Sequence, residues 1–196
     1  MTTFYICRHG ETENNKKFRL SGWVDTPLTE ASLKDIQSII TKLRGVQFDS
    51  VHSSDLGRAF ITAYLITRGI GYTDEIHRHK GLREVNYGDL ANRLWAEVDP
   101  KGLNFLNDTD FVSPNGESLA QMQQRVIACL VALDKDSTGQ TILLVSHDGP
   151  MNAIYTSFAK LDLGDRMKIN VYPHDFVAKF TVSDGKVLSF QEVLNQ

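Results

Sequence analysis

Two short, continuous apolar runs constrain the fold more than any other feature of this sequence. Residues 3–7 (TFYIC) and residues 141–146 (TILLVS) lack the polar–apolar alternation of a half-exposed strand. Runs of this length are typical of strands that are covered on both faces. Each run ends in a polar step with a histidine, His9 in one case and His147 in the other. We therefore expect two buried strands that each deliver a histidine at the carboxyl end.

Segments with helical spacing of apolar residues lie between these two strands. One follows Thr29, a residue type that caps helices, a second follows Ser53 and Ser54, and a third follows Asn115 and Gly116. We expect all three apolar stripes to face the core. The stripes are Leu33, Ile36, Ile40 and Leu43; Leu56, Ala59, Phe60 and Ala63; and Leu119, Met122, Val126, Leu130 and Leu133.

The order of these elements predicts the fold class. Strands that alternate with helices imply an α/β fold with a mainly parallel sheet, and such sheets carry their sites at the carboxyl ends of the strands. Near the end of the sequence, Asp184 and Gly185 separate two apolar segments, residues 176–182 and 187–193. This is a strong hairpin signal, so we expect an antiparallel edge.

Length and composition are those of one ordinary folded domain. The chain has 196 residues, of which 41% are hydrophobic and 23% charged, so disordered and fibrous classes fit poorly. We expect a single domain over residues 1–196. Residues 89–117 fit neither the helical nor the strand period, and we expect them to form a cover over the site.

Charge and cysteine content argue against several partners and locations. The formal net charge is −3 and the pI is about 6.1, which disfavours nucleic acid and anionic membranes as partners. No apolar window has the length of a bilayer span, so we expect neither membrane insertion nor export. Cys7 and Cys129 lie in apolar runs and cannot form a disulfide framework, which suits a reducing cytoplasm. We predict a cytoplasmic protein.

Several residue types in the sequence match the needs of phosphoryl transfer. Negative charge spreads over three phosphate oxygens in this reaction, and the planar fork of arginine suits them better than lysine. A neutral imidazole can attack phosphorus, and two arginine charges beside His9 would disfavour its protonation. Its remaining N–H needs an anchor, such as a backbone carbonyl near Gly10. A carboxylic acid must protonate the leaving alkoxide, and Glu84 is our candidate.

Six motifs follow one another along nearly the whole chain. They are RHGETENN at 8–15, GWVDTPLTE at 22–30, SSDLGRAFITA at 53–63, LREVNYG at 82–88, PNGES at 114–118 and LLVSHDG at 143–149. Together they resemble the motifs of the histidine phosphatase superfamily, also called the phosphoglycerate mutase-like family. The resemblance implies a three-layer α/β/α fold, a small phosphorylated metabolite as the substrate, and a reaction that requires no metal and no cofactor.

The resemblance also implies roles for single residues. His9 becomes phosphorylated, Glu84 donates the proton, and the other positions bind the phosphate or the rest of the substrate. The predicted catalytic residues are His9, Glu84 and His147, and the predicted substrate-binding residues are Arg8, Asn15, Ser21, Gly22 and Arg58. One of these positions departs from the family pattern, because Ser21 stands where glutamine is frequent. The other departures fall outside the predicted site residues and bear on substrate choice. They are Asn14 in place of tryptophan, Ser32 and Asn115 in place of glycine, and Ala91-Asn92 in place of a W-E-G-like element.

Two reactions share this set of residues, hydrolysis by a phosphatase and phosphoryl transfer by a mutase. Residues 89–117 carry two basic and six acidic side chains, a net charge of −4 that makes a poor cover for a glycerate bisphosphate. Family mutases are typically longer here and carry an adjacent arginine pair, which this sequence lacks. We favour hydrolysis of a small phosphate monoester. A cofactor-dependent phosphoglycerate mutase and a non-catalytic binding module are the alternatives, and a homodimer is possible.

The other histidines suggest two further sites that the sequence does not favour. Ser146, His147 and Asp148 are contiguous, but neighbours on an extended strand point to opposite faces and cannot form a hydrolase triad. His77 and His79 could share a strand face and bind a metal, but no third ligand clusters nearby in the sequence. We therefore predict no metal site, and structural or rim positions for His52 and His174.

Overall fold

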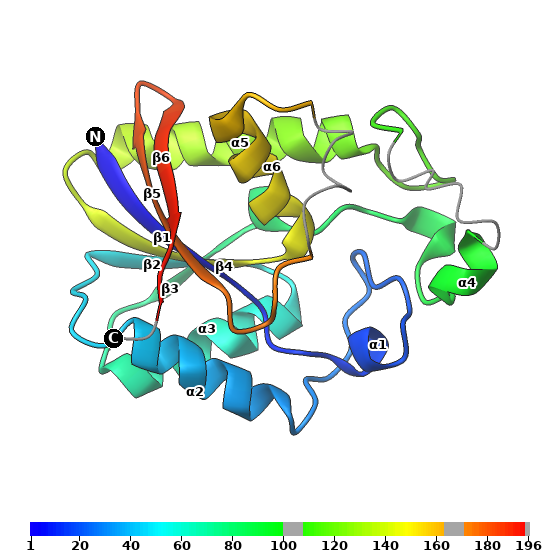
Figure 1. The fold of residues 1–196 in the computed structure, drawn as a ribbon, viewed down its shortest axis with the longest axis horizontal. Coiled ribbons are helices and arrows are strands. Elements are labelled where there is room, and N and C mark those ends of the chain that lie inside the picture. The colour runs from blue at the N-terminus through cyan, green and yellow to red at the C-terminus, as the bar shows by residue number, and fades with distance from the viewer. Residues whose placement is uncertain (100–107, 163–170, 195–196) are drawn as a thin grey trace.

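A six-stranded sheet forms the centre of the protein in the computed structural model, which describes residues 1–99, 108–162 and 171–194 (Figure 1). The strand order is β3-β2-β4-β1-β5-β6. Neighbours among β1 to β4 run parallel, whereas β5 pairs antiparallel with both β1 and β6. The strands are β1 (Thr2–Arg8), β2 (Ser50–Ser54), β3 (Ile76–His79), β4 (Thr141–Ser146), β5 (Val177–Ser183) and β6 (Lys186–Glu192).

Helices cover both faces of this sheet (Figure 1). Helices α2 (Ser32–Lys42) and α3 (Gly57–Ile70) pack on one face, and α5 (Leu119–Asp136) and α6 (Asp148–Ala159) pack on the other. The fold is therefore the three-layer α/β/α arrangement that the sequence predicts. The shorter helical elements are α1 (Glu13–Lys16), η1 (Lys80–Leu82), η2 (Gly88–Leu90) and α4 (Trp95–Val98).

The central strands are apolar throughout because both of their faces are covered. In β4, Ile142 and Leu144 belong to the core under α5 and α6, while Leu143 and Val145 belong to the core under α2 and α3. All four side chains are fully buried. Successive strand residues point to opposite faces, so a strand between two helical layers needs an apolar residue at every position.

The predicted helices are present, but two of the predicted core residues, Leu33 and the partly buried Phe60, are not in the core. All five residues of the stripe in α5 are buried. In α2, Leu33 is 56% exposed, so its prediction as a core residue is wrong. Leu33 lies beside the buried face of the helix, which runs through Ser32, Ile36 and Ile39. Thr29 is not the N-cap, which is Ala31, although Thr29 Oγ1 accepts a hydrogen bond from Ser32 N (3.3 Å).

The predicted hairpin is also present. Strands β5 and β6 flank Asp184 and Gly185, whose φ angles are 51° and 72°. Two consecutive positive φ angles match the right-handed twist of paired strands, which explains the preference for Asp-Gly here. Of the predicted cover, residues 89–99 and 108–117 are described and the others lie outside the described residues. Trp95 N donates to Phe18 O (3.0 Å), which ties this segment to the loop after α1.

None of the helices in the described ranges combines the length and apolarity that a bilayer span needs.

Candidate active site

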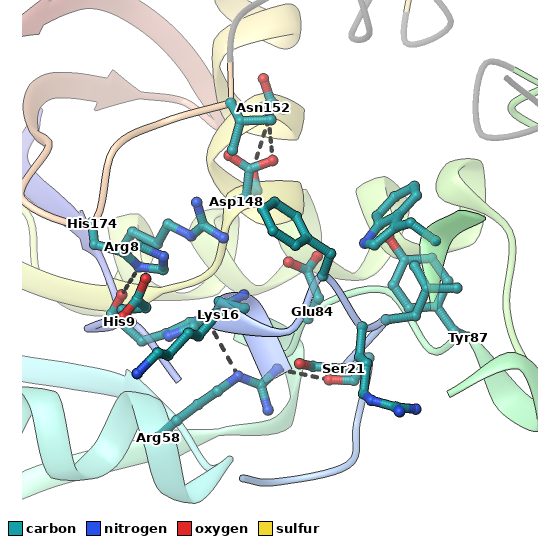
Figure 2. Close-up of a pocket in the computed structure, with 18 residues that line it drawn as sticks. Arg8, His9, Lys16, Ser21, Arg58, Glu84, Tyr87, Asp148, Asn152 and His174 are labelled. Atoms are coloured by element: carbon teal, nitrogen blue, oxygen red, sulfur yellow. Dashed lines mark hydrogen bonds between the residues drawn. The ribbon is translucent and has the colours of Figure 1, made fainter. Parts of the chain in front are cut away.

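The site lies where the carboxyl ends of β1 and β4 meet. These strands pair in parallel with Arg8 opposite Ser146, and His9 N donates to Ser146 O (3.0 Å). Parallel pairing therefore brings His9 and His147 together, with 5.1 Å between their ring centroids. A cavity of about 700 Å³ opens here, and seven of the eight predicted site residues line it (Figure 2). They are Arg8, His9, Asn15, Ser21, Gly22, Arg58 and Glu84.

The hydrogen bonds of His9 fix its tautomer. Arg58 Nε donates to His9 Nε2 (3.3 Å), and because a guanidinium can only donate, this ring nitrogen carries no proton. The proton must then be on Nδ1, which donates to Gly10 O (2.7 Å). The predicted backbone anchor near Gly10 is therefore present. Gly10 must be glycine here, because a Cβ would lie 2.9 Å from the Cβ of Ser32.

Burial and charge keep this imidazole neutral. Its side chain is almost entirely buried, which lowers the pKa of His9 well below its usual value, and the charges of Arg58 and Arg8 lower it further. The hydrogen bond to Gly10 O acts in the opposite direction but is the smaller effect. The arrangement thus presents an unprotonated nitrogen between two fixed cations.

Arg58 is held by the loop that contains the GWVDTPLTE motif. It is 2% exposed, and its terminal nitrogens donate to Gly22 O (2.7 Å) and Val24 O (3.1 Å). It also forms an ion pair with Asp25 (3.1 Å). The Asp25 carboxylate accepts hydrogen bonds from Gly57 N and Arg58 N as well, so it caps the start of α3. Sequence reasoning gave Asp25 no role, although it is the acidic residue of a quoted motif.

Arg8 supplies the second cation from the end of β1. Its Nη1 donates to Tyr172 O (2.8 Å), while its Nε is buried without a hydrogen-bond partner among the described residues. A buried N–H of this kind is costly unless a ligand oxygen accepts it. Arg8 and Arg58 therefore approach His9 from different elements.

His147 lies behind His9, fully buried, and does not line the cavity. Burial lowers the pKa of His147 well below its usual value, and Arg58 and His9 contribute in the same direction. Neither ring nitrogen has a hydrogen-bond partner within the described part of the chain. Ser146 Oγ instead donates to Leu82 O (2.8 Å), which agrees with the rejection of a Ser146–His147–Asp148 triad.

Glu84 lies across the cavity, at the N-terminus of α6 (Figure 2). Its carboxylate accepts hydrogen bonds from Val85 N (2.9 Å) and Gly149 N (3.3 Å). A Cβ on Gly149 would overlap Glu84 Oε1, so only glycine allows this approach. The backbone carbonyl of Glu84 accepts from Arg125 Nη2 (2.6 Å) and Trp23 Nε1 (2.7 Å), which fixes the segment that carries the acid.

Arg125 organises this acid-bearing segment although no sequence motif drew attention to it. Besides Glu84 O, it donates to the carbonyls of Gly81 (3.1 Å) and Arg83 (2.6 Å). It also forms a partly buried ion pair with Glu117 (2.6 Å), the acidic residue of PNGES. Glu117 Oε1 accepts Asn86 N (2.8 Å) too, so the PNGES motif has a structural role in holding residues 81–86.

The three remaining predicted residues line the cavity. Asn15 Oδ1 accepts hydrogen bonds from Thr12 N (3.0 Å) and Thr12 Oγ1 (2.8 Å), so its amide Nδ2 is the group left for a ligand. Ser21 Oγ is buried without a partner among the described residues. Gly22 adopts a φ of 52° and contributes the carbonyl that holds Arg58.

Sequence reasoning missed most of the outer wall of the cavity. Lys16, Phe18, Arg19, Tyr87 and Trp95 line this wall. Phe18 is 77% exposed and has a φ of 53°, an unfavourable backbone conformation for a bulky residue. An apolar period cannot reveal these residues, because they come from loops and short helices.

Two of the departures from the family pattern contact each other at this wall. Asn14 Nδ2 donates to Asn92 Oδ1 (2.7 Å), which links α1 to the start of the cover. Two positions at which the sequence departs from the family pattern are therefore in direct contact.

The histidines at the parallel edge of the sheet lie close together. His52 and His79 form a hydrogen bond (2.8 Å), and the ring centroids of His52 and His77 are 5.0 Å apart. A third histidine, distant in the sequence, therefore joins the pair in space. However, no group of three or more His, Cys, Asp or Glu in the described ranges has a geometry that could hold a metal ion.

Comparison with known proteins identifies the family. The family model of the histidine phosphatase superfamily (branch 1) matches residues 4–189, so the chain belongs to this superfamily. Some of the proteins that it resembles are named as phosphatases and others as mutases.

Three relatives illustrate the range. A protein named probable phosphoglycerate mutase GpmB, from Yersinia pestis (strain Pestoides F), is 32% identical over 166 residues, which cover 82% of this chain and 76% of that protein. The structure of Bacillus stearothermophilus YhfR matches with a TM-score of 0.86 and 26% identity, covering 95% of this chain and 94% of that one. The structure of alpha-ribazole phosphatase from Shigella flexneri matches with a TM-score of 0.83 and 26% identity, covering 99% and 96%.

Proposed function

We propose that this protein is a phosphatase that hydrolyses a small phosphate monoester through a phosphohistidine on His9. The observation that carries the proposal is the pair of hydrogen bonds at His9. Its Nδ1–H is bound to Gly10 O, and its Nε2 lone pair faces a guanidinium. An imidazole in this state is a nucleophile, and the cavity beside it contains the cations that a phosphate requires.

In the first step, His9 Nε2 attacks phosphorus and the bond from phosphorus to the ester oxygen breaks. Arg58 Nε–H then donates its hydrogen bond to a phosphate oxygen in place of the ring nitrogen, and Arg8 Nε–H donates to a second phosphate oxygen. Glu84, in its protonated form, gives its proton to the leaving oxygen, so the alcohol departs neutral. Asn15 lines the cavity, and its Nδ2 can add a hydrogen bond to the phosphate. The predicted phosphate-binding role of His147 requires its ring, which lies behind His9, to reach the phosphate once it is bound.

In the second step, water attacks the phosphohistidine. The Glu84 carboxylate takes the proton from water, the bond from phosphorus to Nε2 breaks, and the His9 lone pair is restored. Inorganic phosphate leaves with the two arginines as its last contacts. Every step uses side chains of this chain, and we propose that no metal takes part.

Hydrolysis is favoured over mutase activity by the charge of the cover, net −4 over residues 89–117. The mutase alternative has one observation in its favour: Lys16 and Arg19 line the outer wall and could bind a second anionic group. The name of the Yersinia relative points in the same direction. The substrate is proposed to be a phosphorylated metabolite of the cytoplasm, where two unpaired cysteines are stable.

Two assays test the proposal. The wild type is expected to hydrolyse an aryl phosphate such as p-nitrophenyl phosphate in excess chelator, and no turnover would contradict it. In the second assay, 3-phosphoglycerate is supplied with a trace of 2,3-bisphosphoglycerate. Release of inorganic phosphate supports a phosphatase, whereas formation of 2-phosphoglycerate supports a mutase.

A further inference from the structure

His174 lies directly beside the nucleophile, although it belongs to none of the six motifs. It follows α6 and precedes β5 in the chain, and it lines the cavity (Figure 2). Its Nδ1 is 2.7 Å from His9 O, and the two ring centroids are 5.6 Å apart. A histidine in this position is close enough to His9 to share its ligand.

This hydrogen bond fixes the tautomer of His174. A backbone carbonyl only accepts, so Nδ1 carries the proton and Nε2 carries a lone pair. Nε2 makes no hydrogen bond to any described residue. The two nitrogens of an imidazole point away from each other, so with Nδ1 turned to the backbone, Nε2 is directed toward the cavity that the ring lines.

The position of the ring is fixed from the other side by the residue that follows it. Asp175 accepts hydrogen bonds from Ser38 Oγ (3.0 Å) and Lys42 Nζ, whose side chain is almost fully buried. Lys42 Nζ also donates to Asp175 O (2.7 Å). The segment is thus attached to α2, which fixes the backbone from which the His174 ring extends, and the hydrogen bond to His9 O holds the ring itself.

Without an anion in the cavity, the groups around His174 together disfavour protonation of its ring. Burial and the charge of Arg8 lower the pKa of His174 to about 4, while the His9 carbonyl, Glu11 and Asp148 act in the opposite direction. These groups come from β1, the loop after it and the start of α6, the elements that surround the ring. A phosphate between the arginines adds negative charge, which favours the protonated imidazole.

We propose that His174 is a further phosphate-binding residue, whose Nε2 takes up a proton from solvent when the phosphate ester binds and donates it as a hydrogen bond to a phosphate oxygen. This inference rests on the proposed phosphate site. Its consequence is that substrate binding is coupled to proton uptake, so that affinity rises as the pH falls toward 5.

Sulfate is the probe that tests this coupling, because it is tetrahedral and stays a dianion across the relevant pH range. Calorimetric titration at pH 5.5 in two buffers of different ionisation enthalpy counts the protons taken up on binding. The matched variant is His174→Asn, because the asparagine amide keeps a donor for His9 O but cannot take up a proton. His174→Gln provides a second non-titrating variant, and His52→Asn controls for a histidine outside the site.

We expect His174→Asn to take up about one proton fewer than the wild type when sulfate binds, since the neighbouring dianion stabilises the charged ring. His52→Asn should match the wild type. With substrate at pH 5.5, His174→Asn should raise KM about tenfold and change kcat little. Equal proton uptake in wild type and His174→Asn, or no binding of sulfate by the wild type, would overturn the inference. Equal uptake would leave the phosphohistidine proposal untouched, because that depends on His9.

Discussion

At the scale of single residues, the proposed activity depends on arginine side chains, whose planar forks no other side chain reproduces. Arg58 simultaneously contacts His9 Nε2, the Gly22 carbonyl and the Asp25 carboxylate. A lysine keeps the charge but has one nitrogen in place of three, so it cannot hold this geometry.

We predict that Arg58→Lys lowers kcat/KM about 10²- to 10³-fold, the usual cost of removing one fixed donor to the developing charge. Steady-state kinetics with p-nitrophenyl phosphate measures the effect. Arg68→Lys, at an exposed position of the same helix, is the control and should retain full activity. An Arg58→Lys enzyme with wild-type kinetics would exclude a role for the guanidinium in phosphate binding.

The glycine beside Glu84 allows a test of the proton donor that leaves the carboxyl group in place. In Gly149→Ala, the new Cβ overlaps Glu84 Oε1 and must displace the carboxylate. We expect kcat to fall about 10²-fold for an alkyl phosphate, which needs the proton. The value of kcat should fall much less for p-nitrophenyl phosphate, because its leaving group does not need a proton.

Ser157→Ala, an exposed position in the same helix, is the control for this variant. Equal losses for the two substrates would argue that Gly149 matters for folding and that Glu84 is not the acid.

At the scale of elements, the acid-bearing segment depends on an ion pair in another part of the chain. Glu117 lies just before α5 in the chain, and its carboxylate accepts hydrogen bonds from Arg125 and Asn86 N. Arg125 in turn holds the carbonyls of residues 81, 83 and 84. Through this link, Glu117 of PNGES fixes the backbone of LREVNYG.

We predict that Glu117→Gln lowers the free energy of unfolding by about 1.5–3 kcal/mol, the usual contribution of a hydrogen bond to a charged group. It should also lower kcat, because Glu84 loses its support. Urea unfolding and steady-state kinetics measure the two effects. Glu75→Gln, at an exposed glutamate, should change neither. If Glu117→Gln were destabilised but fully active, the ion pair would contribute to the stability of the fold and not to catalysis.

At the scale of the whole molecule, several histidines are folded in their neutral form. The pKa of His52 is about 4 in the folded protein, against 6.5 for an unperturbed histidine, because the ring is buried and lies beside His79 and His77. The unfolded chain therefore binds more protons between these two values. The stability that the neutral ring contributes is complete above about pH 6.5 and is lost as the pH falls toward 4.

We predict that the free energy of unfolding falls steeply below pH 6.5, by about 1.4 kcal/mol per pH unit for each such histidine. His52→Asn should reduce this slope by about one proton at pH 5 without affecting the catalytic residues. Urea midpoints between pH 4.5 and 7.5 provide the measurement. A slope unchanged by His52→Asn would show that this ring titrates normally in the fold.

The sequence predicts the sheet, its antiparallel edge and the position of the site because these follow from local patterns. The apolar runs at 3–7 and 141–146 need two covered faces, and parallel pairing then forces His9 and His147 together. It does not predict the contacts of Arg125, and for His174 it predicts only a structural or rim position, since the contacts of both join residues far apart in the chain. Leu33 shows the opposite failure: its spacing fits the predicted stripe, but the side chain is exposed beside a buried face that runs through Ser32, Ile36 and Ile39.

The outer wall of the cavity is the part least accessible from the sequence. Phe18 and Trp95 are brought there by the backbone hydrogen bond between Trp95 N and Phe18 O, in segments without regular periodicity. Substrate choice therefore depends on contacts that only the folded chain reveals.

The central claim is that His9 carries the phosphoryl group between the two half-reactions. Rapid quenching during turnover of a ³²P-labelled substrate tests it most directly. The account predicts protein-bound label that is labile to acid, stable to alkali, located on His9 and absent from His9→Ala. Turnover by His9→Ala at the wild-type rate, or label trapped on a different residue, would contradict it.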